Sequence, residues 1–185
     1  CIESSRGIRI LAQEPWETLC SFIISQNNNI PRIKKIIRAM SEKYGSQIGV
    51  FDGKAEFAFP TAEALAAAGV DEIFALRTGF RAKYIYDCAS KYSLGEIDTA
   101  RIFESDNYEE CEKILENISG VGPKVAACAL LFGFGKTDAF PIDVWIKKVI
   151  AAHFPDGLDY HVFGKYAGIA QQYLFYHERY IAAHS

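Results

Sequence analysis

The chain of 185 residues is 50% hydrophobic, 14% aromatic and 23% charged, with a formal net charge of −3. This hydrophobic fraction excludes a disordered tail, and no apolar run reaches the roughly 18–20 residues that a membrane-spanning helix needs. We therefore expect a globular protein with no membrane partner, either one large domain or two small ones sharing a core. Because Cys1 rather than Met comes first, we expect a fragment or a processed chain.

The charge is segregated along the chain. Between Glu96 and Glu116, eight acidic and two basic residues give a local charge of −6, so the rest of the chain carries +3. Basic residues concentrate over 32–38 and around 77–91. One face is therefore expected to be positive and another acidic, although charge alone does not choose the partner.

Hydrophobic residues recur at helical spacing through most of the chain. In the first such segment, Trp16, Leu19 and Ile23 lie three or four residues apart, which is typical of an amphipathic helix. Only Gly7–Leu11 resembles a strand, and it has no second strand to pair with. We therefore predict an all-α fold with short loops. The predicted helices cover 14–25, 31–44, short segments after residues 61 and 69, 81–92, 107–117, 124–132, 143–154 and 163–183.

A polar run separates the first two predicted helices, with asparagines at positions 27–29 and an arginine at position 32. Asparagine tolerates left-handed backbone and caps helices, so a turn explains one or two of the three. Side-chain amides and a guanidinium at a loop tip also pair with the edges of nucleic-acid bases. Asn27 and Arg32 are therefore candidates for DNA contact.

A second candidate lies before the helix predicted over 81–92. Phe80 stands beside Arg81 and Lys83, and an apolar wedge flanked by cations is what a loop inserted into a duplex requires. A buried phenylalanine that anchors a turn is an equally good interpretation.

The strongest motif is the hairpin over residues 118–125, in which Gly120 and Gly122 flank a valine between two helices. Glycines allow a close backbone approach, and the free N–H groups at the start of the second helix favour a phosphate. An ordinary connection between helices is the alternative. A phosphate site is favoured because Lys124 follows directly.

Lys124 and Asp143 form the candidate catalytic pair. Taken alone, Lys124 is as well explained by neutralisation of a phosphate, and Asp143 by capping of the following helix. A carboxylate held by helix N–H groups nevertheless stays ionised. An amine and such a carboxylate across a cleft suit a reaction that builds positive charge on a sugar.

The last helix places Gln171 and Phe175 four residues apart, on one face. An amide that hydrogen-bonds and a ring that stacks would hold a flat heterocycle, although one core phenylalanine and one surface glutamine is the simpler interpretation. Five cysteines lie at wide, irregular spacings without a CxxC pair. This pattern predicts reduced, mostly buried thiols, with neither zinc nor an iron–sulfur cluster.

Together these motifs resemble the helix-hairpin-helix GPD superfamily of DNA glycosylases, and within it the 8-oxoguanine DNA glycosylase (OGG1-type) family. The hairpin and the Pro-Ile-Asp-Val run over 141–144 are similar to that family's lysine-and-aspartate signature. The run over 27–32 resembles its Asn-Asn-Asn-Ile-x-Arg loop, 79–84 its wedge segment and 166–175 its base-pocket helix. Any one match is weak, but five in the family order are specific.

The resemblance implies two helical subdomains with a DNA-binding cleft between them, the family's β-rich N-terminal domain being absent from this chain. The central subdomain would cover residues 28–122 and end in the hairpin. Residues 1–27 and 123–185 would form the second subdomain, which carries the lysine and the base pocket. The resemblance also implies a monomer that acts on damaged double-stranded DNA, in the cytoplasm or nucleoid of a bacterium or the nucleus of a eukaryote.

The implied reaction is base excision coupled to strand cleavage. The damaged nucleotide flips out of the duplex, neutral Lys124 attacks C1′, and a Schiff base forms as 8-oxoguanine leaves. Asp143 would stabilise the positive charge on the sugar, and β-elimination would then nick the strand. No cofactor is required for this chemistry.

The resemblance assigns further residues by position. Gln171 would read the base edge, and Phe175 and Cys128 would sandwich the base. Backbone carbonyls of the hairpin would hold a structural monovalent or calcium ion. DNA contacts are assigned to Asn27, Arg32, Phe80, Arg81, Gly120, Gly122 and Trp145, and the ion to the carbonyls of Glu116, Ile118 and Val121.

Two departures and two rival functions accompany this interpretation. Trp145 stands where animal members carry a histidine, and Phe80 stands where they carry a tyrosine. One rival is a non-catalytic helix-hairpin-helix module that only binds DNA. The other is an endonuclease III-like glycosylase with a different lesion preference, which the lack of a cysteine after Cys128 disfavours.

Overall fold

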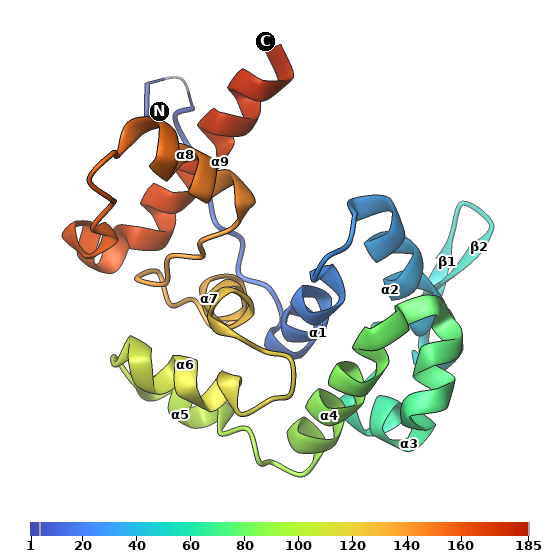
Figure 1. Ribbon diagram of the computed structural model, residues 1–185. Helices are drawn as coiled ribbons and strands as arrows, with labels where there is room; N and C mark the ends of the chain where they lie inside the picture. The colour runs from blue at the N-terminus through green and yellow to red at the C-terminus, as the bar shows by residue number, and fades with distance from the viewer. Residues whose placement is uncertain (4, 185) are drawn as a thin grey trace.

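The computed structural model describes residues 1–3 and 5–184, and these are mainly helical (Figure 1). This confirms the predicted all-α class, with one small antiparallel hairpin added. No helix in the described residues is long and apolar enough to cross a bilayer. The elements are α1 (Pro15–Ser25), α2 (Ile30–Tyr44), β1 (Gln47–Phe51), β2 (Lys54–Phe57), α3 (Ala62–Ile73), η1 (Phe74–Thr78), η2 (Gly79–Arg81), α4 (Ala82–Ser93), α5 (Thr99–Glu104), α6 (Tyr108–Glu116), α7 (Pro123–Phe132), α8 (Val144–His153), η3 (Tyr160–Tyr166) and α9 (Ala167–His184).

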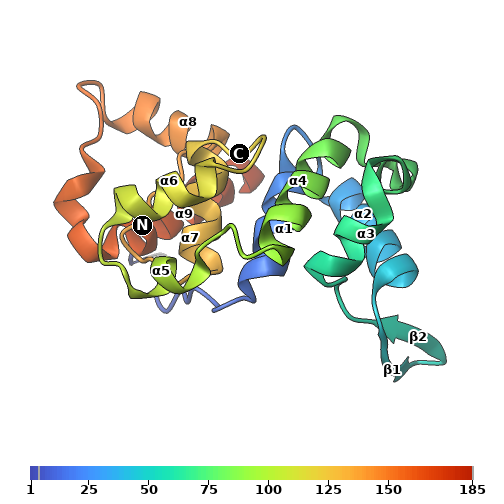
Figure 2. The ribbon, with the colours of Figure 1, turned by 90° about the horizontal axis from the view of Figure 1, so that it is seen from below.

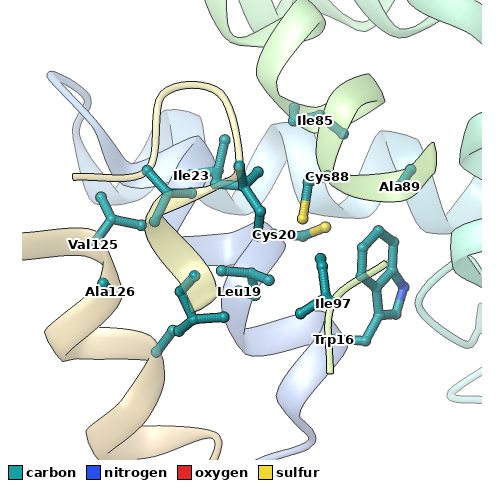
Figure 3. Close-up of a cluster of buried hydrophobic side chains, with 14 of the residues drawn as sticks. Trp16, Leu19, Cys20, Ile23, Ile85, Cys88, Ala89, Ile97, Val125 and Ala126 are labelled. Carbon is teal, nitrogen blue, oxygen red and sulfur yellow. The ribbon is translucent and has the colours of Figure 1, made fainter. Parts of the chain in front are cut away.

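Helix α1 lies in the middle of the molecule. In both ribbon views α2, α3, α4 and the β1–β2 hairpin lie on one side of it, and α5 to α9 lie on the other (Figures 1 and 2). Its inward face explains this position, because Leu19, Cys20 and Ile23 are completely buried. Figure 3 shows these side chains pointing toward α4 at Ile85 and toward α7 at Val125. Each fully buried aliphatic side chain contributes about 1.5–3 kcal/mol, so α1 ties the two sides together.

The buried side chains form two clusters. The larger one takes residues from α1 to α7 and from the turn that follows α7. The smaller one contains Phe140, Ile146 and Ala167, with Phe175 and others packed against it. Because the larger cluster includes both α1 and α7, it spans residues on both sides of the predicted boundaries at 27 and 122. The two-subdomain division stays a prediction.

The strand prediction over Gly7–Leu11 is wrong, because that segment is irregular and pairs with no strand in the described residues. The strands lie instead over 47–57, on either side of a turn at Asp52 and Gly53, which have φ values of 50° and 72°. An Asp-Gly pair between apolar residues is a strong hairpin signal. Helix α5 was also missed, because its six residues are too few for a helical period to be visible.

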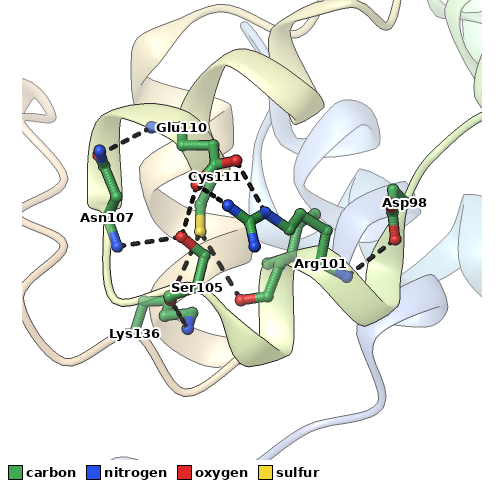
Figure 4. A network of polar contacts seen from close by, with 8 residues as sticks. Asp98, Arg101, Ser105, Asn107, Glu110, Cys111 and Lys136 are labelled. Atoms are coloured by element: carbon green, nitrogen blue, oxygen red, sulfur yellow. Dashed lines mark hydrogen bonds and ion pairs between the residues drawn. The ribbon is translucent and has the colours of Figure 1, made fainter.

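The acidic segment forms its own polar network, drawn in Figure 4. Arg101 donates to Glu110 at 2.8 Å, and Asp98 caps α5 through the N–H of Arg101. The Lys136 ammonium group donates to the carbonyl oxygen of Ser105 at 2.5 Å and so ties the end of α5 to the turn after α7. These residues stabilise the α5–α6 side of the molecule, and none of them lines the cleft described next.

Candidate active site

A cleft of about 1080 Å³ opens where the α1–α2 loop, the starts of α7 and α8, and α9 converge. Four cations line it, from Arg32, Lys124, Lys147 and Arg179, against the single carboxylate of Asp143. This excess of positive charge favours an anionic ligand. Seven of the residues singled out from the sequence line the cleft: Asn27, Arg32, Gly122, Lys124, Asp143, Trp145 and Phe175.

Lys124 and Asp143 reach the cleft from the starts of two different helices. Lys124 is the second residue of α7, with its Nζ exposed and 5.4 Å from the ring centre of Phe22. Asp143 caps α8, and its Oδ1 accepts the N–H groups of Trp145 at 3.0 Å and Ile146 at 2.9 Å. Both predicted functions of Asp143 are thus compatible, because one oxygen is enough for the cap.

Lys124 and Asp143 both line the cleft and form no ion pair within 4 Å in the described structure. The thiol of Cys128 lies beside both. Burial raises the pKa of that thiol to about 11, although the neighbouring Lys124 acts to lower it. The raised pKa argues against Cys128 as a nucleophile, and its predicted place against the base stays a prediction.

The predicted base pocket is only partly open to the cleft. Phe175 lines the cleft, whereas Gln171 and Cys128 are only 3% and 5% exposed and do not. The Gln171 side chain donates to the carbonyl oxygen of Pro141 at 3.1 Å and accepts from Gln172 at 2.6 Å. To bind the edge of a base, Gln171 must give up its hydrogen bonds to Pro141 and Gln172, and its role stays a prediction.

The glycine hairpin is fixed against α4. Gly120 has a φ of +78°, and a Cβ atom on it would collide with the ring of Tyr84. Asp87 accepts the N–H of Ser119 at 2.7 Å, while Lys91 donates to the carbonyl oxygen of Asn117 at 2.6 Å. Burial acts to raise the pKa of Asp87, but the hydrogen bonds from Ser119 and Lys91 outweigh it and lower that pKa below its usual range.

The start of α7 is open to an anion. Gly122 is the N-cap residue, and no side chain in the described structure caps this helix. The exposed helix N-terminus therefore suits a phosphate, as the hairpin sequence predicts. Among the carbonyls assigned to a structural ion, Ile118 O accepts the N–H of Val121 at 3.0 Å and keeps a second lone pair. The hairpin thus fits a carbonyl-bound ion there, and ion binding through Glu116, Ile118 and Val121 stays a prediction.

The asparagine run is partly a cap and partly a loop. Asn29 caps α2, its Oδ1 accepting from the N–H of Arg32 at 3.0 Å, and Asn28 donates to the Ile24 carbonyl oxygen at 3.0 Å. Asn27 has a left-handed φ of 46° and faces the cleft. Capping and hydrogen bonding thus account for Asn28 and Asn29, and the left-handed turn suits Asn27, whose contact with DNA stays a prediction.

The two predicted arginines differ in position. Arg32 lines the cleft and donates to the carbonyl oxygen of Arg77 at 3.0 Å. Arg81 is 2% exposed, and its guanidinium donates to the carbonyl oxygens of Gln26, Asn27 and Thr78. Arg81 thus supports the Asn27 loop through these carbonyl oxygens. A contact to DNA requires it to leave them, and that contact stays a prediction.

Phe80 lies outside the cleft and is 51% exposed, which excludes the buried-anchor interpretation. Its ring meets the Tyr84 ring edge-on at 6.0 Å, and the Arg81 guanidinium lies 4.4 Å from its centre. An exposed ring held by a fixed cation is compatible with the wedge role, which no contact in the described structure tests.

Sequence reasoning missed two cations of the cleft, Lys147 and Arg179. Arg179 lies 6.0 Å from the ring centre of Trp145 and 5.6 Å from that of Phe175. The ammonium group of Lys148 lies 4.4 Å from the ring centre of the same tryptophan, Trp145. The spacing of Gln171, Phe175 and Arg179 by four residues was the available signal, because it places all three on one face of α9.

Comparisons with known proteins agree with this geometry. Residues 20–157 match the family model of the HhH-GPD superfamily base excision DNA repair proteins. The N-glycosylase/DNA lyase of Saccharomyces cerevisiae is 38% identical over 156 residues, which cover 79% of this chain and 42% of the yeast protein. The N-glycosylase/DNA lyase OGG1 of Arabidopsis thaliana is 33% identical over 92% of this chain and 52% of its own length.

A solved structure with a similar fold is that of the Clostridium acetobutylicum 8-oxoguanine glycosylase/lyase in complex with double-stranded DNA containing cytosine opposite 8-oxoguanine. It superposes with a TM-score of 0.88 and is 40% identical, covering 98% of this chain and 65% of that one. The chain spans less than two thirds of the length of these relatives. Since the family model covers most of the sequence, the chain belongs to the HhH-GPD superfamily of base excision DNA repair proteins.

Proposed function

We propose that this chain is the catalytic part of a bifunctional DNA glycosylase and AP lyase that excises 8-oxoguanine from duplex DNA. The observation that carries the proposal is the meeting of Lys124 and Asp143, nineteen residues apart in sequence, in a cleft that is otherwise cationic. The yeast and Arabidopsis relatives are N-glycosylase/DNA lyases and the Clostridium relative is an 8-oxoguanine glycosylase/lyase, which supports the same chemistry.

The reaction follows from these two side chains. The neutral Lys124 amine attacks C1′ of the flipped nucleotide, the N-glycosidic bond breaks, and the base takes the bonding electrons and a proton. The bond between C1′ and the ring oxygen O4′ then breaks, O4′ takes the bonding electrons and a proton, and the Schiff base between Lys124 and C1′ forms. Removal of a C2′ proton then expels the 3′ phosphate by β-elimination. Asp143, whose Oδ1 is held by the N–H groups at the start of α8, stabilises the positive charge on the sugar in the first step.

DNA is part of the proposed active site. Lys124 is exposed in the free cleft, so entry of a nucleotide is needed to exclude water around it. The open start of α7 and the cations Arg32 and Lys147 would hold the phosphates. No metal or cofactor takes part in the chemistry, and an ion on the hairpin carbonyls would be structural. Such an enzyme would work in the nucleoid or nucleus, depending on its source.

Borohydride trapping tests the proposal directly. The wild-type chain is incubated with a duplex carrying 8-oxoguanine opposite cytosine and reduced, with Lys124→Gln as the test variant. Lys147→Gln is the matched control, because Lys147 is another lysine of the same cleft. We expect a covalent adduct with the wild type and with Lys147→Gln and none with Lys124→Gln.

The alternatives give different results. A DNA-binding module without catalysis forms no adduct in any variant while still binding the duplex. An endonuclease III-like glycosylase forms the adduct with an oxidised pyrimidine but not with 8-oxoguanine. An unchanged adduct in Lys124→Gln would show that another amine is the nucleophile.

A further inference from the structure

One face of α9 runs from the interior of the molecule to the mouth of the cleft. Gln171 is buried, Phe175 is half-buried and Arg179 is exposed, and each follows the last by four residues. At 1.5 Å per residue, Arg179 lies about 12 Å along the helix from Gln171. The stripe therefore changes from an amide through an aromatic ring to a cation as it approaches solvent.

The Arg179 side chain packs against two aromatic rings. Its guanidinium lies 5.6 Å from the ring centre of Phe175 and 6.0 Å from that of Trp145. No cation of the cleft forms an ion pair with a carboxylate in the described part of the chain. Stacking on aromatic faces orients a guanidinium while its N–H donors stay available.

A nucleotide has the same order of chemical groups as this stripe. Its base has a hydrogen-bonding edge and a flat face, and its phosphate lies at the opposite end, beyond the sugar. A base that enters with its edge toward Gln171 and its face on Phe175 leaves its phosphate at the cleft mouth. A guanidinium with free donors is the group best suited to bind a phosphodiester there.

We propose that Arg179 binds a backbone phosphate of the flipped nucleotide, so that α9 recognises the nucleotide from its base edge to its phosphate. The inference rests on the proposed function, since the phosphate reaches α9 only when the nucleotide leaves the duplex. Trp145 then has a positioning role, because its ring is one of the two on which the guanidinium rests. Lys148 stacks on the same indole at 4.4 Å and adds positive charge beside it.

The test measures DNA affinity as a function of salt, using a duplex with an uncleavable tetrahydrofuran abasic analogue and the same duplex undamaged. The test variant is Arg179→Gln, and Arg179→Lys keeps the charge without the planar group. Arg101→Gln is the matched control, because Arg101 is paired with Glu110 on the acidic side of the molecule. Both duplexes are titrated with all four proteins.

We expect Arg179→Gln to weaken binding of the analogue duplex by roughly 5–20-fold. The slope of log K against log salt concentration should fall by about 0.9, the loss of one phosphate contact. Affinity for the undamaged duplex should stay within about twofold of the wild type, and Arg101→Gln should change neither value. Arg179→Lys should keep most of the slope.

The outcomes separate this inference from the proposed function. If the wild type does not prefer the analogue duplex, the proposed function fails and the phosphate contact fails with it. If the wild type has that preference but Arg179→Gln leaves the slope unchanged, or weakens both duplexes equally, only the role of Arg179 is refuted.

Discussion

The buried side chain of Gln171 needs hydrogen-bond partners in the free chain and is also the group predicted to bind the edge of the base. In the structure its amide is satisfied by Pro141 and Gln172, so no polar atom is left without a partner. A base that offers the same donors and acceptors can replace these partners at little net cost, because a hydrogen bond exchanged for another contributes only about 1 kcal/mol. An abasic sugar offers no such replacement and leaves Gln171 where it is.

This difference predicts the effect of Gln171→Ala on the two substrates. Excision of 8-oxoguanine should slow by roughly 10–100-fold, since about 1.5–3 kcal/mol of base recognition is lost. Cleavage at a preformed abasic site should change by less than about threefold. Single-turnover rates on both duplexes measure this. Equal losses would place Gln171 outside the base pocket.

At the level of single residues, the sequence predicted the cleft residues whose position is set by the local backbone. Lys124, Asp143 and Gly122 reach the cleft because each occupies the start of a helix, and helix starts leave recognisable signals. The hydrogen bonds of Arg81 could not be predicted, because its partners, the carbonyls of residues 26 and 27, lie 55 and 54 residues away along the chain. Arg179 was missed because only the folded chain shows that its neighbours are Trp145 and Phe175.

At the level of elements, the hairpin between α6 and α7 depends on α4 for its shape. Tyr84 lies against Gly120, and Asp87 and Lys91 bind the turn at Ser119 and Asn117. The start of α7, which carries Lys124, is therefore positioned by a helix that contributes nothing to the cleft surface itself. Tight contact at Gly120 allows this, because any side chain there would separate α4 from the hairpin.

Gly120→Ala and Gly122→Ala test this dependence as a matched pair. At Gly120 the left-handed φ and the collision with Tyr84 together should cost about 2–4 kcal/mol. The melting temperature should therefore fall by roughly 5–15 °C. At Gly122 a methyl group meets open space and φ is −111°, so the loss should be about 1 kcal/mol or less. Thermal unfolding of both variants measures these losses. Similar losses of stability in the two variants would show that the glycine hairpin is not fixed by Tyr84.

Whole elements were predictable where a hydrophobic period ran for ten residues or more. The helices around the cleft begin and end within a few residues of their predicted bounds, because caps such as Asn29 and Asp143 mark them. The hairpin over 47–57 escaped detection because its strand residues are almost all exposed, so no buried face creates an alternating pattern. Its Asp52-Gly53 turn was the signal that remained.

At the scale of the molecule, the candidate catalytic pair joins two unequal hydrophobic clusters. Lys124 stands on α7, which belongs to the large cluster around α1, and Asp143 begins α8, which belongs to the small one. Among the residues whose burial is described, the small cluster has three buried hydrophobic members, so α8 and α9 should open locally more readily than α1 and α7. The start of α9 is joined to the turn after α7 at Gly168, whose N–H donates to the carbonyl oxygen of Thr137 at 2.7 Å.

Hydrogen exchange should therefore reveal coupling between the clusters when DNA binds. In the free chain, amides of α8 and α9 should exchange at least about tenfold faster than those of α1 and α7. Binding of the tetrahydrofuran duplex should slow exchange in α8 and α9, because a nucleotide held by Lys124 on one side and by Asp143, Phe175 and Arg179 on the other adds contacts that local opening would break. An undamaged duplex is the control, and it should protect α8 and α9 less. Equal protection of all four helices in the free chain would show that the small cluster is as stable as the large one, and that the cleft is rigid before DNA arrives.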